Sequence, residues 1–126
     1  MIFLPRAVKV YVASEPTNLR QSFDGLSNQV RHVLRQDPLS GHVFIFVNRR
    51  RNQVKLLAWT RGGFMIVHKR LERGTFAFAR GLGLDGDAKC VLIDVHELSL
   101  LLEGIEIVKG RISKRWEPKR HMAAVG

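Results

Sequence analysis

The sequence predicts an α+β domain in which a mainly antiparallel sheet, a meander, carries one long N-terminal helix and one short C-terminal helix. Between residues 43 and 70, β-rich segments follow one another through short polar connections, which is typical of antiparallel hairpins. On either side of this region, apolar residues recur at helical spacing. The chain of 126 residues has the size of one domain, which we place in residues 1–108, followed by a basic tail in residues 109–126.

The N-terminal part is predicted to form a strand and then the long helix. Residues 8–12 alternate and are β-rich, which indicates a strand. Asn18 is placed to cap a helix, with Gln21 three residues later, and an apolar stripe continues to about Gln36, where Asp37 and Pro38 stop it. The stripe consists of Leu19, Phe23, Leu26, Val30 and Val33.

Three strands are predicted to follow as the meander. Residues 43–47 are apolar at every position and so favour a central strand, and residues 54–59 and 64–70 form the next two. Four-residue loops, 49–52 and 60–63, connect them. Because successive hairpin turns alternate ends, the arginines of these two loops are expected at opposite ends of the sheet.

The C-terminal part is predicted to add two short strands and the short helix. The strands are expected at residues 75–79 and 90–94, and Asp94 with Glu97 frames the start of the helix. Its core-facing residues are Leu98, Leu101, Leu102 and Ile105. The tail loses apolar periodicity, so we expect it to be mobile when no partner is bound.

Basic residues are concentrated in two blocks of the chain. The formal net charge is +10, and residues 49–73 carry eight Lys and Arg against one acidic residue. The tail carries six against one, whereas residues 74–108 are net acidic. Scattered charge would serve solubility, so two dense blocks indicate a surface for a polyanion, either nucleic acid or an anionic membrane. Basic side chains that are merely solvated remain the alternative.

The candidate nucleic-acid-binding residues are the basic side chains of these blocks. Arginine binds phosphate through two parallel hydrogen bonds, and aromatic residues nearby, such as Trp116, can stack on bases. A face lined by Lys55, Lys69 and Arg70 is the candidate bridge between the two loops. The full set is Arg49, Arg50, Arg51, Lys55, Arg61, Lys69, Arg70 and Arg73, with Arg111, Lys114, Arg115, Lys119 and Arg120 in the tail.

Targeting and membrane segments are not predicted. The first residues form neither a basic leader nor the apolar stretch of ~7–15 residues that a secretory signal requires. The longest apolar run, about five residues, is far shorter than the ~20 that span a bilayer. We therefore expect a cytoplasmic protein without a membrane partner.

No cofactor, metal or catalytic residue is predicted. The five histidines lack metal-ligand spacing, and residues 81–86 match the dinucleotide-binding pattern G-x-G-x-x-G but precede a strand where that pattern requires a helix. Asp94 and Glu97 are sufficiently explained as a helix cap. A weaker alternative is a metal-dependent nuclease built on Asp85, Asp87, Asp94 and Glu97.

Several sequence blocks, in order and at matching separations, carry a family resemblance. They are NLRQSFDGL at 18–26, DPLSG at 37–41, VFIFVNRR at 43–50, KLLAW at 55–59, GF at 63–64 and KRLERG at 69–74. Over about residues 6–105 they resemble the small TnpB-type accessory protein of the insertion-sequence sixty-six family. The sequence departs from the family at Asn18, where Asp is usual, at Gln21, where a basic residue is common, and at Phe78-Ala79, where an aromatic-proline pair is usual.

The resemblance implies a bacterial mobile-element protein that assists transposition, a form of DNA recombination, without being the enzyme. A larger transposase encoded beside it would cut and join the strands, and no catalytic residue is carried over. Our leading hypothesis is an accessory factor that binds DNA through the basic hairpin and the tail, with the transposase of the same element as a further partner. The alternative is a protein-interaction adaptor that docks on the transposase through the sheet edge or the helix face, without direct DNA binding.

Overall fold

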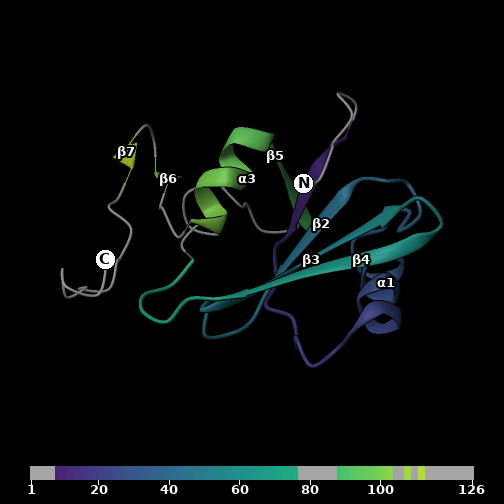
Figure 1. Ribbon diagram of the computed structural model, residues 1–126, viewed down its shortest axis with the longest axis horizontal. Coiled ribbons are helices and arrows are strands. Elements are labelled where there is room, and N and C mark those ends of the chain that lie inside the picture. Colours follow the sequence, from purple (N-terminus) through teal and green to yellow (C-terminus); the bar gives the residue numbers. More distant parts are fainter. Residues whose placement is uncertain (1–7, 77–87, 104–106, 109–110, 113–126) are drawn as a thin grey trace, which may run out of the picture.

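A five-stranded sheet forms the centre of the computed structural model, which describes residues 8–76, 88–103, 107–108 and 111–112 (Figure 1). The sheet has the order β4-β3-β2-β1-β5. Its strands are β1 (Val10–Ala13), β2 (Val43–Val47), β3 (Gln53–Thr60), β4 (Gly63–Arg70) and β5 (Cys90–Ile93). Helix α1 (Phe23–His32) connects β1 to β2, and helix α3 (Val95–Leu102) follows β5. Two further short strands, β6 (Ile107–Val108) and β7 (Arg111–Ile112), pair with each other.

The sheet is mixed, so the prediction of a mainly antiparallel meander with a long helix is wrong, although the α+β class is correct. β1 pairs with β2 in parallel, with Val10 opposite Val43, and the other pairings within this sheet are antiparallel. The physical reason is the connection through α1, because a helix that crosses back over the sheet starts the next strand in the same direction. β2, predicted to be central, is central and buried at all five positions.

Helix α1 is also shorter than predicted, with 10 residues instead of a run from Asn18 to about Gln36. At the N-terminal side, the Asn18 Oδ1 accepts a hydrogen bond from the backbone N–H of Arg20 at 3.0 Å, which closes a local turn. At the C-terminal side, Arg35 has a φ of 57° and the N–H of Gln36 donates to the carbonyl of Val30 at 3.0 Å. Helices commonly end in this way, with a left-handed residue followed by an N–H that donates back to a carbonyl in the last turn of the helix. Apolar spacing therefore extended into turns whose backbone is not helical.

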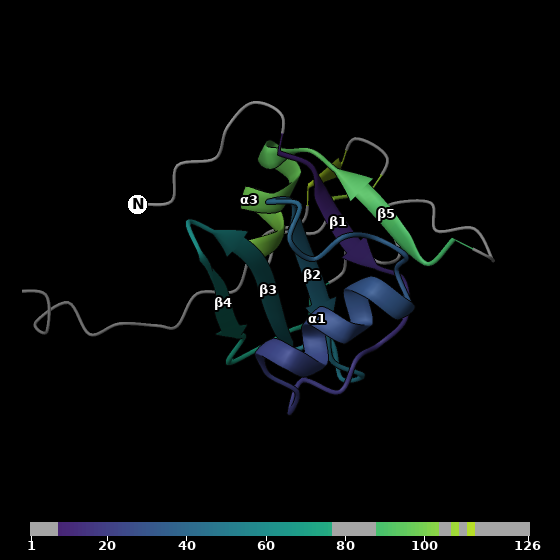
Figure 2. The same cartoon turned by 90° about the vertical axis from the view of Figure 1, so that its right-hand side faces the viewer.

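Each face of the sheet has its own hydrophobic core, and α1 and α3 lie on opposite sides of the sheet (Figure 2). On the α1 side, Leu26 and Val30 pack with Phe44 and Phe46 of β2. On the α3 side, Leu98 belongs to one cluster with the valines of β1 and β2 and with Ile45. Because side chains alternate along a strand, β2 supplies both cores and holds the two helices to one frame.

The start of α3 confirms the predicted capping box. The Asp94 carboxylate accepts from the N–H of Glu97 at 2.7 Å, and the Glu97 carboxylate accepts from the N–H of Asp94 at 3.0 Å. Leu98 and Leu101 are buried as expected. Ile105 and most of the strand expected at 75–79 lie outside the described residues. Within the described ranges, no helix has the length and apolarity to cross a membrane.

The β3–β4 hairpin is tighter than predicted. Thr60 pairs with Gly63, which leaves Arg61 and Gly62 as a two-residue turn instead of a four-residue loop. Their φ angles are 42° and 85°, so both lie in the left-handed region that a type I′ turn requires. Glycine adopts this region easily and arginine rarely does. The turn projects Arg61 at the end of the sheet opposite the β2–β3 connection.

Replacing Phe44 by alanine should destabilise the protein by about 3–5 kcal/mol, because the ring is fully buried and its loss leaves a cavity under α1. The ring also stacks on Tyr11, with centroids 5.5 Å apart. Urea unfolding followed by circular dichroism measures the change. Leu92→Ala is the control, since Leu92 is 55% exposed and should change stability by less than about 0.5 kcal/mol. Equal losses in the two variants would contradict this packing.

Candidate nucleic-acid interface

Three segments that are distant in the sequence meet at one end of the sheet. β1 and β2 are parallel, so the chain leaves both at this end, and the N–H of Thr17 donates to the carbonyl of Val47 at 2.8 Å. The segment after β4 returns to the same place, where the N–H of Phe76 donates to the carbonyl of Arg51 at 2.6 Å. We call residues 48–52, which connect β2 to β3 here, the arginine loop.

Asn48 holds the arginine loop in shape. Its Oδ1 accepts from the backbone N–H groups of Asn52 and Gln53, each at 3.0 Å, and its Nδ2 donates to the Asn52 Oδ1 at 2.8 Å. The loop thereby closes on itself, and Arg49 and Arg50 are exposed at its tip. Arg51, half-buried, has a φ of 61° and completes the turn.

The segment before α1 is tied to the sheet by Lys55 of β3. The Lys55 Nζ donates to the carbonyl of Gln21 at 2.8 Å. Gln21 also lies close against α1 at Gly25, where an added Cβ would be 2.8 Å from the Gln21 Cβ. Glycine permits this approach, and together with the Asn18 turn it places Arg20 beside the arginine loop.

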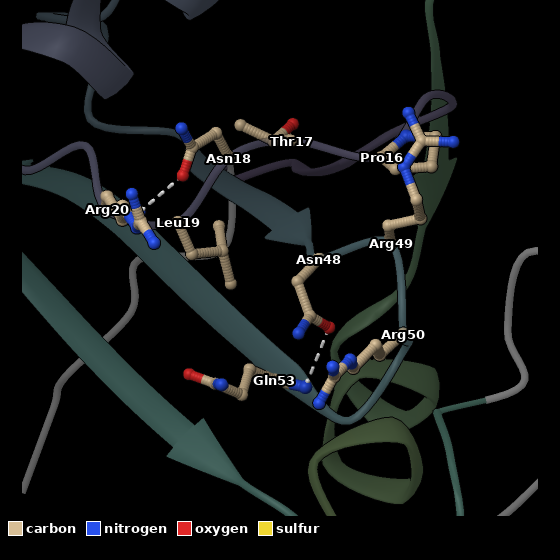
Figure 3. A pocket seen from close by; sticks show the side chains of 9 residues that line it. All are labelled: Pro16, Thr17, Asn18, Leu19, Arg20, Asn48, Arg49, Arg50 and Gln53. Carbon is tan, nitrogen blue, oxygen red and sulfur yellow. Dashed lines mark hydrogen bonds between the residues drawn. The ribbon is translucent and has the colours of Figure 1, made fainter.

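Between these two segments lies a pocket of about 610 Å³, which we call the arginine pocket (Figure 3). Arg20 is on one side of it, and Arg49 and Arg50 are on the other. Leu19, which is buried, supplies an apolar part of the wall. None of the lining residues is acidic. The lining consists of Pro16, Thr17, Asn18, Leu19, Arg20, Asn48, Arg49, Arg50 and Gln53.

The arginine pocket has a strongly positive character. In the part of the chain that the structure describes, the guanidinium groups of Arg20, Arg49 and Arg50 have no carboxylate partner. Hollows lined by one sign of charge concentrate the field and attract oppositely charged groups. Arginine also presents a planar array of donors that matches the oxygens of phosphate. The arrangement can therefore bind an anion with several acceptor oxygens.

Two predicted phosphate contacts are engaged with backbone carbonyls. Lys55 donates to Gln21, and Lys69 donates to the carbonyl of Leu102 at the C-terminus of α3, where the helix dipole favours a cation. Lys55 lies on the α1 side of the sheet and Lys69 on the α3 side. The predicted face lined by Lys55, Lys69 and Arg70 is therefore wrong, because adjacent residues of a strand point to opposite faces.

The other predicted residues are distributed over several places. Arg70 ends β4 and forms an ion pair with Glu72 at 2.7 Å, a hydrogen bond that raises the pKa of the Arg70 guanidinium. Arg73 is exposed in the segment that follows, and Arg61 occupies the opposite end of the sheet. Arg111 lies in β7. The remaining tail candidates, Lys114, Arg115, Lys119 and Arg120, lie outside the described residues.

Arg20 is a pocket residue that the sequence analysis did not select. The predicted helix began at Asn18, which would place Arg20 on a polar helix face. The structure begins α1 at Phe23, with Ser22 as N-cap, so Arg20 belongs to the connection at the end of the sheet. The signal that could have found it is Asn18 itself, since asparagine initiates local turns as readily as it caps helices.

The acidic residues do not assemble into a metal site in the described part of the chain. The carboxylates of Asp94 and Glu97 each accept a hydrogen bond from the backbone N–H of the other residue in the capping box of α3. No group of three His, Cys, Asp or Glu residues within the described ranges is arranged to hold a metal ion. Asp85, Asp87 and the glycine pattern at 81–86 lie outside those ranges.

Comparison with known proteins gives a family match over most of the chain. The family described as IS66 Orf2 like protein matches residues 8–111. The chain is similar to Uncharacterized protein y4hO of Sinorhizobium fredii (strain NBRC 101917 / NGR234), with 34% identity over 100 residues that cover 79% of this chain and 82% of the relative. It is also similar to Uncharacterized protein y4jC of the same strain, with 30% identity over 106 residues, 84% of this chain and 86% of the relative. No solved structure matches the chain.

Replacing Asn48 by alanine should open the arginine loop and destabilise the protein by about 1–3 kcal/mol, because two partly buried backbone N–H groups lose their acceptor. Urea unfolding measures this loss. Asn28→Ala serves as the control, because Asn28 is exposed on α1. If Asn48→Ala unfolds at the same urea concentration as Asn28→Ala, the side chain does not hold the loop.

Proposed function

Because the chain belongs to the IS66 Orf2 like family, a family of insertion-sequence accessory proteins, we propose that it assists transposition by binding DNA at the arginine end of its sheet. The observation that carries the proposal is the arginine pocket. Three guanidinium groups without carboxylate partners in the described residues are brought together there by the β1–α1 and β2–β3 connections. Cations that gather on one surface without carboxylates to neutralise them are suited to a phosphate backbone.

The roles of the basic residues follow from their contacts. Arg20, Arg49 and Arg50 are the phosphate contacts, supported by Arg51 in the same loop. Lys55 and Lys69 act as positioning residues, since their ammonium groups hold the segment before α1 and the end of α3. The basic tail, with Arg111, Lys114, Arg115, Lys119 and Arg120, serves as an auxiliary clamp on the backbone.

This mode of binding positions the protein on DNA without reading its sequence. Contacts to phosphate fix register and orientation but carry no direct information about the bases. Recognition of the ends of the element is therefore assigned to the transposase, and the accessory protein contributes affinity and geometry.

The second candidate function is an adaptor that docks on the transposase, and β4 favours it. β4 pairs with β3 and is the outer strand of the sheet over eight residues. Its residues Phe64, Met65, Ile66 and Val67 are only half-buried. An open strand edge can accept a strand from another protein through backbone hydrogen bonds.

Fluorescence anisotropy with a labelled duplex at about 50 and 200 mM salt tests DNA binding. For the wild type, affinity should fall steeply with salt, and Arg49→Ala/Arg50→Ala should lower the slope of log K against log salt by about 2, since each lost phosphate contact removes about 0.9. Lys9→Ala/Arg31→Ala removes the same charge, and because Lys9 precedes β1 and Arg31 lies in the last turn of α1, it should leave the slope near the wild-type value. Absence of binding by the wild type at 50 mM salt would overturn the proposal.

The adaptor function predicts a different result for the same variants. Arg49→Ala/Arg50→Ala should still co-purify with the transposase after nuclease treatment, because the β4 edge is unchanged. Loss of the wild-type association on nuclease treatment would assign it to DNA that bridges the two proteins, and loss in the variant alone would place the contact at the arginine loop and contradict docking through β4.

A further inference from the structure

The arginine pocket offers hydrogen-bond donors beyond its three guanidinium groups. The Asn18 Oδ1 accepts from the N–H of Arg20, and the Gln53 Oε1 forms a hydrogen bond with the His68 Nε2 at 2.8 Å. The amide nitrogens of Asn18 and Gln53 have no partner in the described part of the structure. The pocket lining contains no carboxylate. The ligand that suits this lining carries negative charge and many acceptor oxygens.

The shape of the pocket selects among nucleic-acid forms. Its volume of about 610 Å³ falls within the range of sites that hold a small molecule or a single nucleotide. The convex backbone of a duplex can rest on the exposed arginines, but it leaves the hollow between Arg20 on one side and Arg49 and Arg50 on the other unfilled. A single nucleotide that has left the stack can enter the hollow.

The distribution of polar and apolar groups suits such a nucleotide. Arg20 stands on one side of the hollow and Arg49 and Arg50 on the other, so consecutive phosphates of one strand can each find a cation (Figure 3). Pro16, drawn beside Arg49, and Leu19, drawn beside Arg20, are apolar parts of the lining that can contact the sugar and base between those phosphates. The lining has no aromatic residue, so the pocket holds the strand through its phosphates more than through stacking.

We propose that the arginine pocket receives one unpaired nucleotide of a DNA strand, with its flanking phosphates held by Arg20 on one side and by Arg49 and Arg50 on the other. The proposal rests on the proposed function, because it names the form of DNA that binds at the same site. Arg20 is the residue that distinguishes the two, since an inserted nucleotide places a flanking phosphate directly against it, opposite Arg49 and Arg50.

The test compares three fluorescent probes of one sequence: a blunt duplex, the same duplex with a short unpaired tail, and the single strand. For the wild type, the tail should strengthen binding about tenfold or more, the effect of one or two hydrogen bonds to a charged group. Arg20→Ala should remove this gain and weaken binding of the tailed duplex at least about tenfold more than binding of the blunt duplex. It should also lower the salt slope for the single strand by about 0.7, the contribution of one phosphate contact.

Arg31→Ala is the matched control, because it removes one exposed arginine from the last turn of α1 and should retain the gain from the tail. Urea unfolding of Arg20→Ala should equal that of the wild type, since the Arg20 side chain is exposed. Free thymidine monophosphate should compete only at far higher concentration than the tailed probe. Displacement at equal concentration would assign the pocket to a free nucleotide and overturn the proposal.

The remaining outcomes separate this proposal from the proposed function. Equal wild-type affinity for the blunt and tailed duplexes would overturn the unpaired nucleotide and leave DNA binding intact. The same holds if Arg20→Ala weakens both probes alike. Failure of the wild type to bind any of the three probes would overturn both.

Discussion

Because β1 and β2 run parallel, the chain leaves both strands at the same end of the sheet, and this constraint determines what that end can contain. An antiparallel pair would have sent the connections to opposite ends and separated Arg20 from Arg49 and Arg50. The crossover through α1 produces the parallel pairing, and it also covers one face of the sheet. A single topological choice therefore supplies both a core and a concentration of arginines at one end of the sheet.

The basic residues divide into two groups with different physical roles. Lys55 and Lys69 each use a flexible stem and a compact ammonium group to reach a backbone carbonyl, which fixes the segment before α1 and the end of α3. The arginines of the pocket make no such contact in the described residues and keep their donors for a ligand. This division agrees with the chemistry of the side chains. A planar guanidinium binds phosphate through two parallel hydrogen bonds, whereas an ammonium acts as a point charge.

Elements with local sequence signals were predicted correctly. The prediction failed where the apolar spacing continues but the backbone is no longer helical. The uninterrupted apolar run of β2 identified a central strand, and Asp94 with Glu97 identified the start of α3. The apolar stripe around α1 continued past both true ends of the helix, because Asn18 forms a turn and Arg35 adopts a left-handed conformation. The parallel pairing depends on contacts between distant segments, which no window of sequence contains. Arg20 was missed because the Asn18 turn was interpreted as the start of a helix. The parallel pairing of β1 and β2 brings it into the arginine pocket.

The open edge of β4 has a consequence for the behaviour of the protein in solution. Charge at this strand is confined to its last residues, Lys69 and Arg70, so the backbone along Phe64–Val67 has no charged side chain to discourage pairing with another copy. The net charge of +10 supplies repulsion over a longer range, and salt screens that repulsion. The ionic conditions that release a polyanion therefore also remove the barrier to edge-to-edge association. A bound polyanion neutralises the same charge. Binding of a polyanion at the arginine pocket and edge-to-edge association of β4 strands are therefore coupled through the net charge.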